Sequence, residues 1–326
     1  MKKNILVTGG AGYIGSVAVQ NLVQQGHQII VVDNLSRGDS LLDYIKSVTK
    51  FYQIDIAKEK DKLQEIFAEH KFDAVIHFAA YKSVEESMEN PEKYKDNVIG
   101  TENLLDLMGE YNVNKIIFSS SAAVYKVPII SAQSVIMPTT ENDPLGPSNI
   151  YGETKLECEE KIQDFCAKHK ITYINLRYFN VAGDGGLNYV DPKPENIFSI
   201  IMETFVGERD EFIIFGKDYP TKDGTCIRDY IHINDLVRAH ILALDAEESV
   251  AINLGTSKGY SVLELVSLTE EVIGKKINYR FGPRRAGDSV ALIASYEKAK
   301  KILGWQPEKS IREMISSEFQ VYNKLK

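Results

Sequence analysis

The chain carries the stretch ILVTGGAGYIGSVAVQNLVQQGHQIIVVD from Ile5 to Asp33, and this stretch decides the fold. A short apolar run over residues 5–7 leads into closely spaced glycines, and apolar residues then recur at helical spacing over residues 14–22. A second apolar run over residues 29–32 ends on Asp33. The pattern predicts a strand, a glycine-rich turn, a helix and a second strand that an acidic residue closes.

Gly10, Gly12 and Gly15 match the spacing G-x-G-x-x-G. The three glycines allow a tight turn, a close approach of backbone to a pyrophosphate, and close packing of the helix on the strand. The amino end of the helix then holds the phosphates through its open N–H groups and positive dipole. A glycine turn in any α/β protein is the alternative, but the strands, helix and acid around this one favour a dinucleotide-binding site.

Asp33 indicates which dinucleotide binds. It lies 33 − 15 = 18 residues after Gly15, close to the usual spacing of ~20 for a ribose-binding acid. A carboxylate at this position accepts hydrogen bonds from ribose hydroxyls and repels a 2′-phosphate. The sequence therefore predicts NAD as the cofactor, although Arg37 nearby leaves NADP open.

Strands and helices alternate through the first half of the chain, which predicts a parallel sheet with helices on both faces. We expect an α/β fold, with a doubly wound, Rossmann-like parallel sheet and a smaller C-terminal α/β substrate domain. Ligands of such sheets bind at the carboxyl ends of the strands. The expected strands are 51–56, 74–78, 115–119 and 172–176, and the expected helices are 60–70, 97–111 and 151–169.

The character of the sequence changes after Phe179, where Gly, Pro and Asp fill an expected loop at 184–196. Further along we expect strands at 212–215 and 278–281 and a helix at 261–273. We therefore predict an NAD-binding domain over residues 1–178, with residues 230–257 returning to it, and a substrate-binding domain over residues 179–326.

The bulk properties exclude several classes of protein. The 326 residues suffice for a large core, and a net charge of −8 argues against a nucleic-acid-binding surface. Cys158, Cys166 and Cys226 lack metal-binding spacing, so we expect no metal and reduced thiols in a cytoplasmic protein. No apolar run approaches the ~20 residues that span a membrane. A strand begins almost directly after Lys3, so we also expect no signal peptide.

Ser121, Tyr151 and Lys155 are the candidate catalytic residues. Tyr151 and Lys155 are four residues apart in an expected helix, so both can face the same side. A free tyrosine is a poor base at neutral pH, but a nearby lysine cation favours the phenolate and makes it usable as a general base or acid. Ser121 lies two residues past an expected strand, at the ligand-binding edge. A Tyr-x-x-x-Lys pair alone occurs by chance on many helices, but the upstream dinucleotide motif favours the catalytic interpretation.

Further motifs make the chain similar to the extended short-chain dehydrogenase/reductase family and, within it, to the UDP-glucose 4-epimerases. The resemblance covers almost the whole chain, and the segment around Arg228 is its most specific part. Besides the glycine turn it rests on Asp33-Asn34-Leu35-Ser36, His77-Phe78-Ala79-Ala80, Ser119-Ser120-Ser121, Tyr151-Gly152-Glu153-Thr154-Lys155, Arg177-Tyr178-Phe179-Asn180, Asp218-Tyr219-Pro220-Thr221, Arg228-Asp229-Tyr230-Ile231-His232 and Pro283-Arg284-Arg285-Ala286-Gly287-Asp288.

The resemblance implies a chemical role for each catalytic residue. Tyr151 would take the proton of the sugar 4-hydroxyl while a hydride passes from C4 to NAD. Lys155 would favour the Tyr151 phenolate and hold the nicotinamide ribose, and Ser121 would assist the proton transfer. The 4-keto sugar would then turn within the site and receive the hydride on its other face, so that NAD stays bound.

The resemblance also implies two sets of binding residues and a homodimer that pairs through helices 97–111 and 151–169. NAD contacts would come from Gly9, Gly12, Tyr13, Ile14, Gly15, Asp33, Asn34, Asp55, Ile56, Phe78, Ala79, Lys82, Asn97, Tyr151, Lys155 and Phe179. UDP-sugar contacts would come from Ser121, Tyr151, Asn180, Asn196, Ile197, Phe215, Arg228, Arg285, Asp288 and Leu292.

Elementary chemistry agrees with several of these assignments and leaves alternatives open. The guanidinium groups of Arg228 and Arg285 are planar donors that suit a pyrophosphate, and salt bridges with Asp229 or Asp288 are the alternative. Phe215 can stack on a uracil ring or fill a core.

Asp55 raises a similar choice, because it follows an expected strand. From there its side chain can reach an adenine ring, or it can act like an N-cap before the helix that begins at Lys60.

The chain departs from the family in four places. Val17 and Lys126 stand where epimerases usually carry histidine and glycine. The stretch from Ser121 to Tyr151 is several residues longer than usual and contains an apolar insert at 129–137. Leu292 takes a position that is a tyrosine or a small residue in family members. A bulky side chain there restricts the sugar pocket, so the breadth of substrates stays open.

The expected activity is that of a UDP-glucose 4-epimerase, which interconverts UDP-galactose and UDP-glucose through a transient 4-keto sugar. An epimerase of another UDP-sugar such as UDP-N-acetylglucosamine, a net oxidoreductase and a non-catalytic NAD-binding scaffold are the alternatives. A nucleotide-sugar dehydratase is disfavoured because Ala122 and Ala123 follow Ser121 where those enzymes carry Asp and Glu. A scaffold would be expected to lose Tyr151 or Lys155, and the chain retains both.

Overall fold

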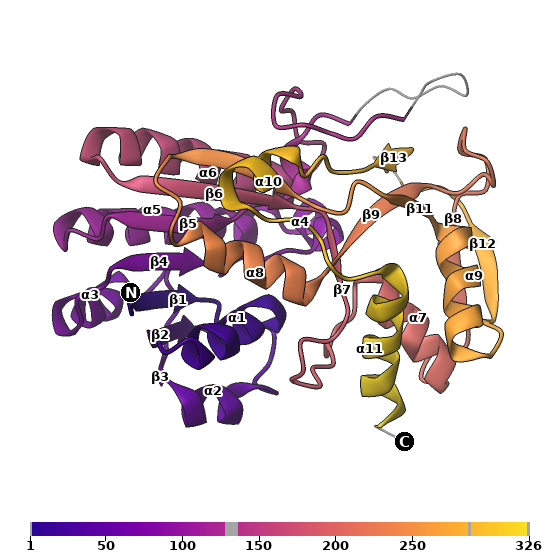
Figure 1. The fold of residues 1–326 in the computed structure, drawn as a ribbon, viewed down its shortest axis with the longest axis horizontal. Helices are drawn as coiled ribbons and strands as arrows, with labels where there is room; N and C mark the ends of the chain where they lie inside the picture. The colour runs from indigo at the N-terminus through magenta and orange to yellow at the C-terminus, as the bar shows by residue number, and fades with distance from the viewer. Residues whose placement is uncertain (1, 128–135, 286–287, 325–326) are drawn as a thin grey trace. The chain divides into compact units, whose positions relative to one another are not determined.

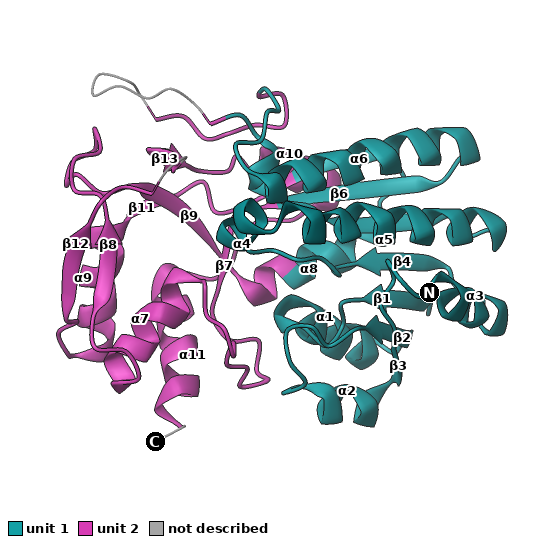
Figure 2. Cartoon of the chain, turned by 180° about the vertical axis from the view of Figure 1, so that it is seen from behind, with its two compact units in different colours: residues 1–126, 144–177, 237–252 teal, residues 127–143, 178–236, 253–326 magenta. Residues whose placement is uncertain are grey.

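The computed structural model describes residues 2–127, 136–285 and 288–324 (Figure 1). The expected apolar insert at 129–137 lies mostly outside the described residues, as do Ala286 and Gly287. The chain forms two compact units (Figure 2). Unit 1 comprises residues 1–126, 144–177 and 237–252, and unit 2 comprises residues 127–143, 178–236 and 253–326.

Seven strands within the described residues form one sheet in the order β10-β6-β5-β4-β1-β2-β3. The strands β1 to β6 pair in parallel. Because the chain winds from β1 outward to β3 and then from β4 outward in the other direction, the predicted doubly wound sheet is confirmed. The strands are β1 (Asn4–Thr8), β2 (Gln28–Asp33), β3 (Lys50–Gln53), β4 (Ala74–His77), β5 (Lys115–Ser119), β6 (Thr172–Tyr178) and β10 (Val250–Leu254).

Helices cover both faces of this sheet. Figures 1 and 2 show α5 and α6 on one face and α1 and α8 on the other. The helices around the sheet are α1 (Tyr13–Gln24), α2 (Leu42–Val48), α3 (Lys60–Glu69), α4 (Val84–Glu89), α5 (Pro91–Glu110), the 3₁₀ turn η1 (Ala122–Val124), α6 (Ile150–His169) and α8 (Ile233–Ala243).

The burial of β1 explains the first sequence motif. Ile5, Leu6 and Val7 are fully buried, as a strand covered on both faces requires. In the register, Thr8 at the end of β1 pairs with Val32 of β2 and with His77 of β4. The glycine turn, Asp33 and the loop after β4 therefore start from the same carboxyl edge of the sheet, where ligands of such folds bind.

Unit 2 is the smaller α/β part that the sequence predicts. Its strand β9 pairs with β7, β11 and β13, while β8 pairs with β12. Helix α11 packs on α7 and α9 over an apolar core that includes Phe198, Met202 and Ile315. The elements are β7 (Asn180–Ala182), α7 (Ile197–Val206), β8 (Phe212–Phe215), β9 (Ile227–His232), β11 (Gly259–Ser261), α9 (Val262–Ile273), β12 (Tyr279–Gly282), β13 (Ala291–Leu292), α10 (Glu297–Leu303) and α11 (Ile311–Asn323).

Candidate active site

The glycine turn between β1 and α1 leaves no room for side chains at Gly9 and Gly15. Gly9 has a φ of +72°, and an added Cβ would lie 2.6 Å from the backbone nitrogen of Ala79. A Cβ on Gly15 would lie 2.1 Å from the carbonyl oxygen of Gly9. Gly12 is the N-cap of α1 and makes no side-chain cap. The first-turn N–H groups, which begin at Tyr13 and Ile14, and the helix dipole therefore suit a phosphate.

Asp33 is oriented at the end of β2 by backbone donors. Its Oδ2 accepts from the N–H of Ala11 at 3.0 Å, and its Oδ1 accepts from the N–H of Leu35 at 2.8 Å. Burial raises the pKa of Asp33, and the two N–H groups oppose this shift. The carboxylate is thus fixed beside the glycine turn, in the place that a ribose-binding acid occupies in this kind of fold.

Asn34 and Asp55 are joined at the ends of β2 and β3. Asn34 Nδ2 donates to Asp55 Oδ2 at 3.1 Å, and Asp55 Oδ1 accepts from the N–H of Ala57 at 3.0 Å. The N-cap of α3 is Glu59, so the carboxylate of Asp55 closes a local turn rather than capping that helix. Ile56 is buried within this turn.

Phe78 and Ala79 follow β4 directly. The N–H of Phe78 donates to the carbonyl of Thr8 at 3.0 Å, and its ring centroid lies 4.8 Å from that of His240. The backbone of Ala79 packs against Gly9, since an added Cβ on Gly9 would lie 2.6 Å from the Ala79 nitrogen. The loop after β4 therefore forms one wall of the glycine turn.

Asn97 of α5 holds the same loop. Its Oδ1 accepts from the N–H of Tyr81 at 2.8 Å, and its Nδ2 donates to the carbonyl of Tyr81 at 3.1 Å and to Thr154 Oγ1 at 3.3 Å. Because its amide is engaged with the protein, Asn97 positions this loop. Lys82, one residue beyond Tyr81, is exposed.

Lys155 is a buried cation at the end of the central strands. Its Nζ donates to the carbonyl of Ser119 at 2.8 Å and lies 4.6 Å from the centre of the Phe118 ring. Burial lowers the pKa of Lys155 to about 8. A lysine with this pKa can stabilise a neighbouring anion near neutral pH and can also exchange a proton.

Ser121 and Tyr151 start two turns that pack directly on each other. Ser121 is the N-cap of η1 and accepts from the N–H of Ala123 at 3.1 Å. Tyr151 lies in the first turn of α6, which Asn149 caps. An added Cβ on Gly152 would lie 2.4 Å from the carbonyl oxygen of Ala123, so α6 approaches η1 as closely as backbone allows. Unit 1 thus brings Ser121, Tyr151 and Lys155 to the edge that carries the glycine turn.

The predicted residues of unit 2 fall into two groups, and the first surrounds β7. Phe179 is buried, and Asn180 Nδ2 donates to the carbonyl of Asp229 at 2.9 Å. Asn196 caps α7, accepting from the N–H of Phe198 at 3.1 Å, and Ile197 begins that helix. Both asparagine side chains therefore fix local backbone in the structure.

The second group lies on β8, β9, β13 and the segment before β13. The guanidinium of Arg285 lies 4.0 Å from the centre of the half-buried Phe215 ring. Arg228 Nη2 donates to Asp288 Oδ1 at 3.0 Å, and Leu292 pairs with Arg228 in the register of β13 and β9. The salt-bridge alternative for Arg228 is therefore present, and Phe215 stacks on a cation rather than in a core.

Asp229, named above only as a possible salt-bridge partner of the arginines, instead organises the backbone around β9. It is fully buried, and its carboxylate accepts from the N–H groups of Thr256, Ser257 and Ala294 at 2.9 to 3.1 Å. Burial raises its pKa to about 6. Because Ala294 follows β13 by two residues, this carboxylate holds the strand of Leu292 beside β9. The sequence signal that could have identified Asp229 is an acidic residue directly after Arg228 within a strand.

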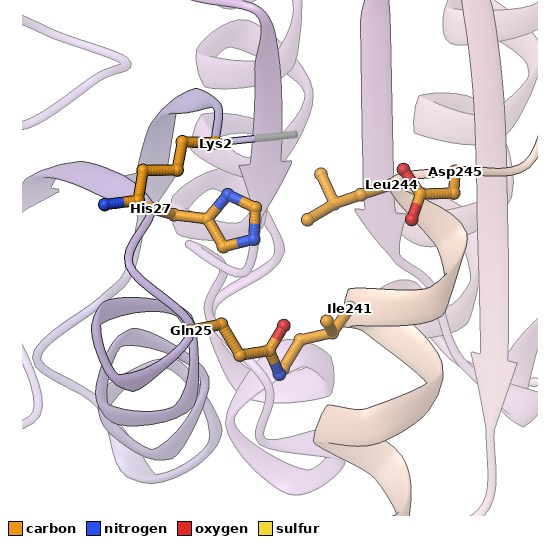
Figure 3. A pocket seen from close by; sticks show the side chains of 6 residues that line it. All are labelled: Lys2, Gln25, His27, Ile241, Leu244 and Asp245. Carbon is orange, nitrogen blue, oxygen red and sulfur yellow. The ribbon is translucent and has the colours of Figure 1, made fainter.

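A pocket at the other edge of the unit 1 sheet is separate from these residues (Figure 3). Lys2 precedes β1 and His27 precedes β2, so the pocket adjoins the amino ends of the strands. Parallel α/β sheets bind their ligands at the opposite ends. The lining residues are Lys2, Gln25, His27, Ile241, Leu244 and Asp245.

The described part of the chain offers neither a metal-binding cluster nor a membrane-spanning helix. Over residues 2–127, 136–285 and 288–324, no group of three or more His, Cys, Asp or Glu side chains is arranged to hold a metal ion. In the same residues, the helices are too short or too polar for any to cross a membrane.

Residues 5–255 match the NAD dependent epimerase/dehydratase family. The chain is 46% identical over 312 residues to UDP-glucose 4-epimerase of Halalkalibacterium halodurans, covering 93% of this chain and 90% of that protein. It is 43% identical over 331 residues to the Bacillus subtilis enzyme of the same name, covering 97% of this chain and 96% of that protein.

Solved structures agree with these relatives. The UDP-glucose 4-epimerase of Stenotrophomonas maltophila, with bound NAD and formylated UDP-arabinopyranose, has a TM-score of 0.91 and 36% identity, covering 99% of this chain and 98% of that one. The enzyme of Bifidobacterium longum, in complex with NAD+ and UDP, has a TM-score of 0.89 and 38% identity, covering 98% of each chain.

Proposed function

The chain belongs to the NAD-dependent epimerase/dehydratase family, and from this premise we propose that it is a UDP-glucose 4-epimerase that interconverts UDP-galactose and UDP-glucose with tightly bound NAD. The observation that carries the proposal is the placement of Ser121, Tyr151 and Lys155 at the sheet edge that holds the glycine turn. Relatives named UDP-glucose 4-epimerase at 41–46% identity over almost the whole chain support it.

The residues of unit 1 fit NAD. Gly9 and Gly15 let the turn and α1 pack closely, while an added Cβ on Gly12 would meet only the Gly9 carbonyl oxygen at 3.5 Å, so Gly12 leaves the start of α1 open to a pyrophosphate. Asp33 is fixed where it can accept from ribose hydroxyls, which suits NAD better than NADP. NAD held by these residues would supply the hydride acceptor for sugar C4 and the hydride donor for the 4-keto sugar.

The protein supplies the proton chemistry. Tyr151 takes the proton of the sugar 4-hydroxyl and returns it after the sugar has turned. Lys155, buried one turn further along the same helix and with a pKa of about 8, stabilises the negative charge on the tyrosine oxygen. Ser121, held at the start of η1, hydrogen-bonds the same sugar oxygen and passes the proton. The reaction is redox-neutral, because the hydride removed from C4 is the one restored.

Unit 2 supplies the groups that suit a nucleotide-sugar. We assign Arg228 and Arg285 to the pyrophosphate, because planar guanidinium groups bind phosphate oxygens through paired donors. Arg228 would then exchange its bridge with Asp288 for the ligand. Phe215, already stacked on a cation, offers its ring to the uracil.

The sugar range of the enzyme depends on Leu292. The leucine side chain is intermediate in size between the bulky residues that narrow such a pocket and the small residues that widen it. Its position is fixed because β13 pairs with β9 and Asp229 binds the backbone of Ala294. An epimerase of an N-acetylated UDP-sugar is therefore the second candidate function. Conversion of UDP-N-acetylgalactosamine beside UDP-galactose would support it.

Two further properties complete the proposal. The enzyme is a homodimer in which α5 and α6 of each copy pair across a two-fold axis, and it works in the cytoplasm. A single species of monomer mass in analytical ultracentrifugation at micromolar concentration would contradict the dimer. Recovery of the native protein in a membrane or secreted fraction would contradict the location.

The test of the activity is Tyr151→Phe, which removes only the hydroxyl. The variant is expected to lose turnover of UDP-galactose by a factor of about 10² or more while it keeps its NAD. Tyr173→Phe, on β6 outside the site, is the matched control and is expected to retain activity. A Tyr151→Phe protein with wild-type turnover would refute the assigned role.

A further inference from the structure

Helix α6 carries a third buried functional group in line with Tyr151 and Lys155. Glu159 lies one turn beyond Lys155, at the same spacing of four that separates Lys155 from Tyr151, so the three side chains share one face of the helix. All three are buried, and Glu159 is 0% exposed. The proposed reaction uses Tyr151 and Lys155 and leaves Glu159 without a role.

Side chains on this face of α6 form hydrogen bonds with successive residues at the end of β5 and just after it. Lys155 Nζ donates to the carbonyl of Ser119, and the hydroxyl of Ser120 donates to Glu159 Oε1. Successive turns of α6 thus hold successive residues of the segment that leads to Ser121. The hydrogen bond from Ser120 is buried, so water does not compete for it.

Arg177 of β6 completes the arrangement. Its Nε donates to Glu159 Oε1 at 2.9 Å and its Nη2 donates to Glu159 Oε2 at 2.6 Å, which makes a paired, buried salt bridge. Its Nη1 donates to the hydroxyl of Tyr125 at 3.0 Å. Residues 120 and 125, on either side of Ser121, are therefore both tied to the Glu159–Arg177 pair.

A buried ion pair of this kind is a poor source of stability, because desolvation of the two charges offsets their attraction. Its geometry is more informative, since a bidentate pair fixes both distance and orientation. We propose that Glu159, held by Arg177, is a positioning residue of the active site that fixes Ser121 against Tyr151 and supports the charge of Lys155. This inference rests on the proposed epimerase function.

The electrostatic part follows from the surroundings of Lys155. Burial lowers the pKa of Lys155, while Cys158 and then Glu159 on its own helix act in the opposite direction. Burial raises the pKa of the Cys158 thiol to about 11, so that thiol is neutral at working pH. Across the sheet, burial and Lys155 lower the pKa of His77 to about 3, so His77 is neutral at working pH. With the Phe118 ring and the Ser119 carbonyl as its other neighbours, Lys155 depends on Glu159 for a permanent negative charge.

The experiment replaces the charge without changing the shape, by Glu159→Gln. We expect kcat for UDP-galactose to fall by about tenfold or more, with a smaller change in KM, because the acid–base pair is misplaced. We also expect the basic limb of the kcat profile to move to lower pH by about half a unit or more, because Lys155 loses its proton more readily. Glu157→Gln, on the exposed face of the same helix, is the matched control and should change neither.

Two further measurements separate the possible outcomes. Ser120→Ala keeps both charges and removes only the hydrogen bond to Glu159, so it should lower kcat and leave the pH profile in place. The ionisation of Lys155 is followed without turnover by NMR of lysine labelled with ¹³C at Cε, assigned through Lys155→Met. Its midpoint should be lower in Glu159→Gln than in the wild type.

A merely structural role would lower thermal stability and leave the pH profile and the Lys155 midpoint unchanged, and that result would overturn the inference. If Glu159→Gln fails to fold, Ser120→Ala becomes the test. A wild-type kcat in Ser120→Ala would then overturn the positioning role of Glu159. A wild-type protein that does not convert UDP-galactose would instead overturn the proposed function, while the NMR midpoint still decides whether Glu159 supports Lys155.

Discussion

Glu318 of α11 is a buried acid whose replacement should stabilise the protein in a pH-dependent way. Its Oε2 accepts from the N–H of Gly183 at 3.1 Å, and its Oε1 accepts from Ser199 Oγ at 2.9 Å. Burial raises the pKa of Glu318 from 4.5 to about 7, and Asp184 adds to the shift, while the two donors oppose it. Glu318→Gln removes the charge and can keep both hydrogen bonds, since the hydroxyl of Ser199 can also accept.

The magnitude follows from proton linkage. The folded state binds a proton at Glu318 more tightly than the unfolded state, so the stability that this proton confers is present below pH 4.5. It is lost as pH rises through about 7. A tenfold difference in proton affinity corresponds to about 1.4 kcal/mol. Between pH 5 and pH 8 the wild type should therefore lose about 2.5 kcal/mol of unfolding free energy at this residue, and the Gln variant should not.

The assay is chemical denaturation of both proteins at pH 5 and pH 8. The unfolding free energy of Glu318→Gln minus that of the wild type is expected to be about 2.5 kcal/mol larger at pH 8 than at pH 5, so the variant is relatively more stable at pH 8. Glu313→Gln on the same helix is a control that should show almost no difference between pH 5 and pH 8, because Lys309 lowers the pKa of Glu313 to about 2 and its linked stability is lost only below about pH 5. An equal difference at both pH values for Glu318→Gln would refute the reasoning.

Three other substitutions test the site. Gly15→Ala places a methyl 2.1 Å from the Gly9 carbonyl oxygen; it should displace α1 and lower the NAD that co-purifies, measured by release on denaturation, and a full NAD content would contradict this. Lys155→Met should lower kcat by a factor of about 10². It should also abolish the fall in kcat that we expect for the wild type as pH rises through about 8. If the variant still shows this fall, another group causes it. Asp229→Asn turns an amide donor toward the N–H groups of its neighbours and should lower unfolding free energy by about 2–3 kcal/mol, whereas wild-type stability would show that those bonds are dispensable.

The sequence predicted the parallel sheet because its strands are continuous apolar runs between helices with regular periodicity. It placed the helix after β4 at 97–111, whereas α5 begins at Pro91. The proline was the available signal, since it is favoured in the first turn of a helix. Helix α11 was not predicted, because Glu318 occupies a core position and interrupts the apolar periodicity.

The residues of the candidate site likewise include some that the sequence identifies and some that it does not. Its glycines, Asp33, Tyr151 and Lys155 lie in local patterns with fixed spacing, so the sequence identifies them. The buried acids Glu159 and Asp229 depend on partners in other elements; Asp229 and Ala294, for example, are 65 residues apart. A single sequence cannot pair such residues, because the pairing exists only once distant elements pack together.

The epimerase activity itself is tested with the wild-type protein as purified, UDP-galactose and no added NAD. Chromatography of the nucleotide sugars is expected to show UDP-glucose accumulating to an equilibrium mixture, while absorbance at 340 nm stays constant because no NADH is released. Continuous growth of that absorbance, or UDP-galactose that stays unchanged even with NAD added, would contradict a redox-neutral 4-epimerase.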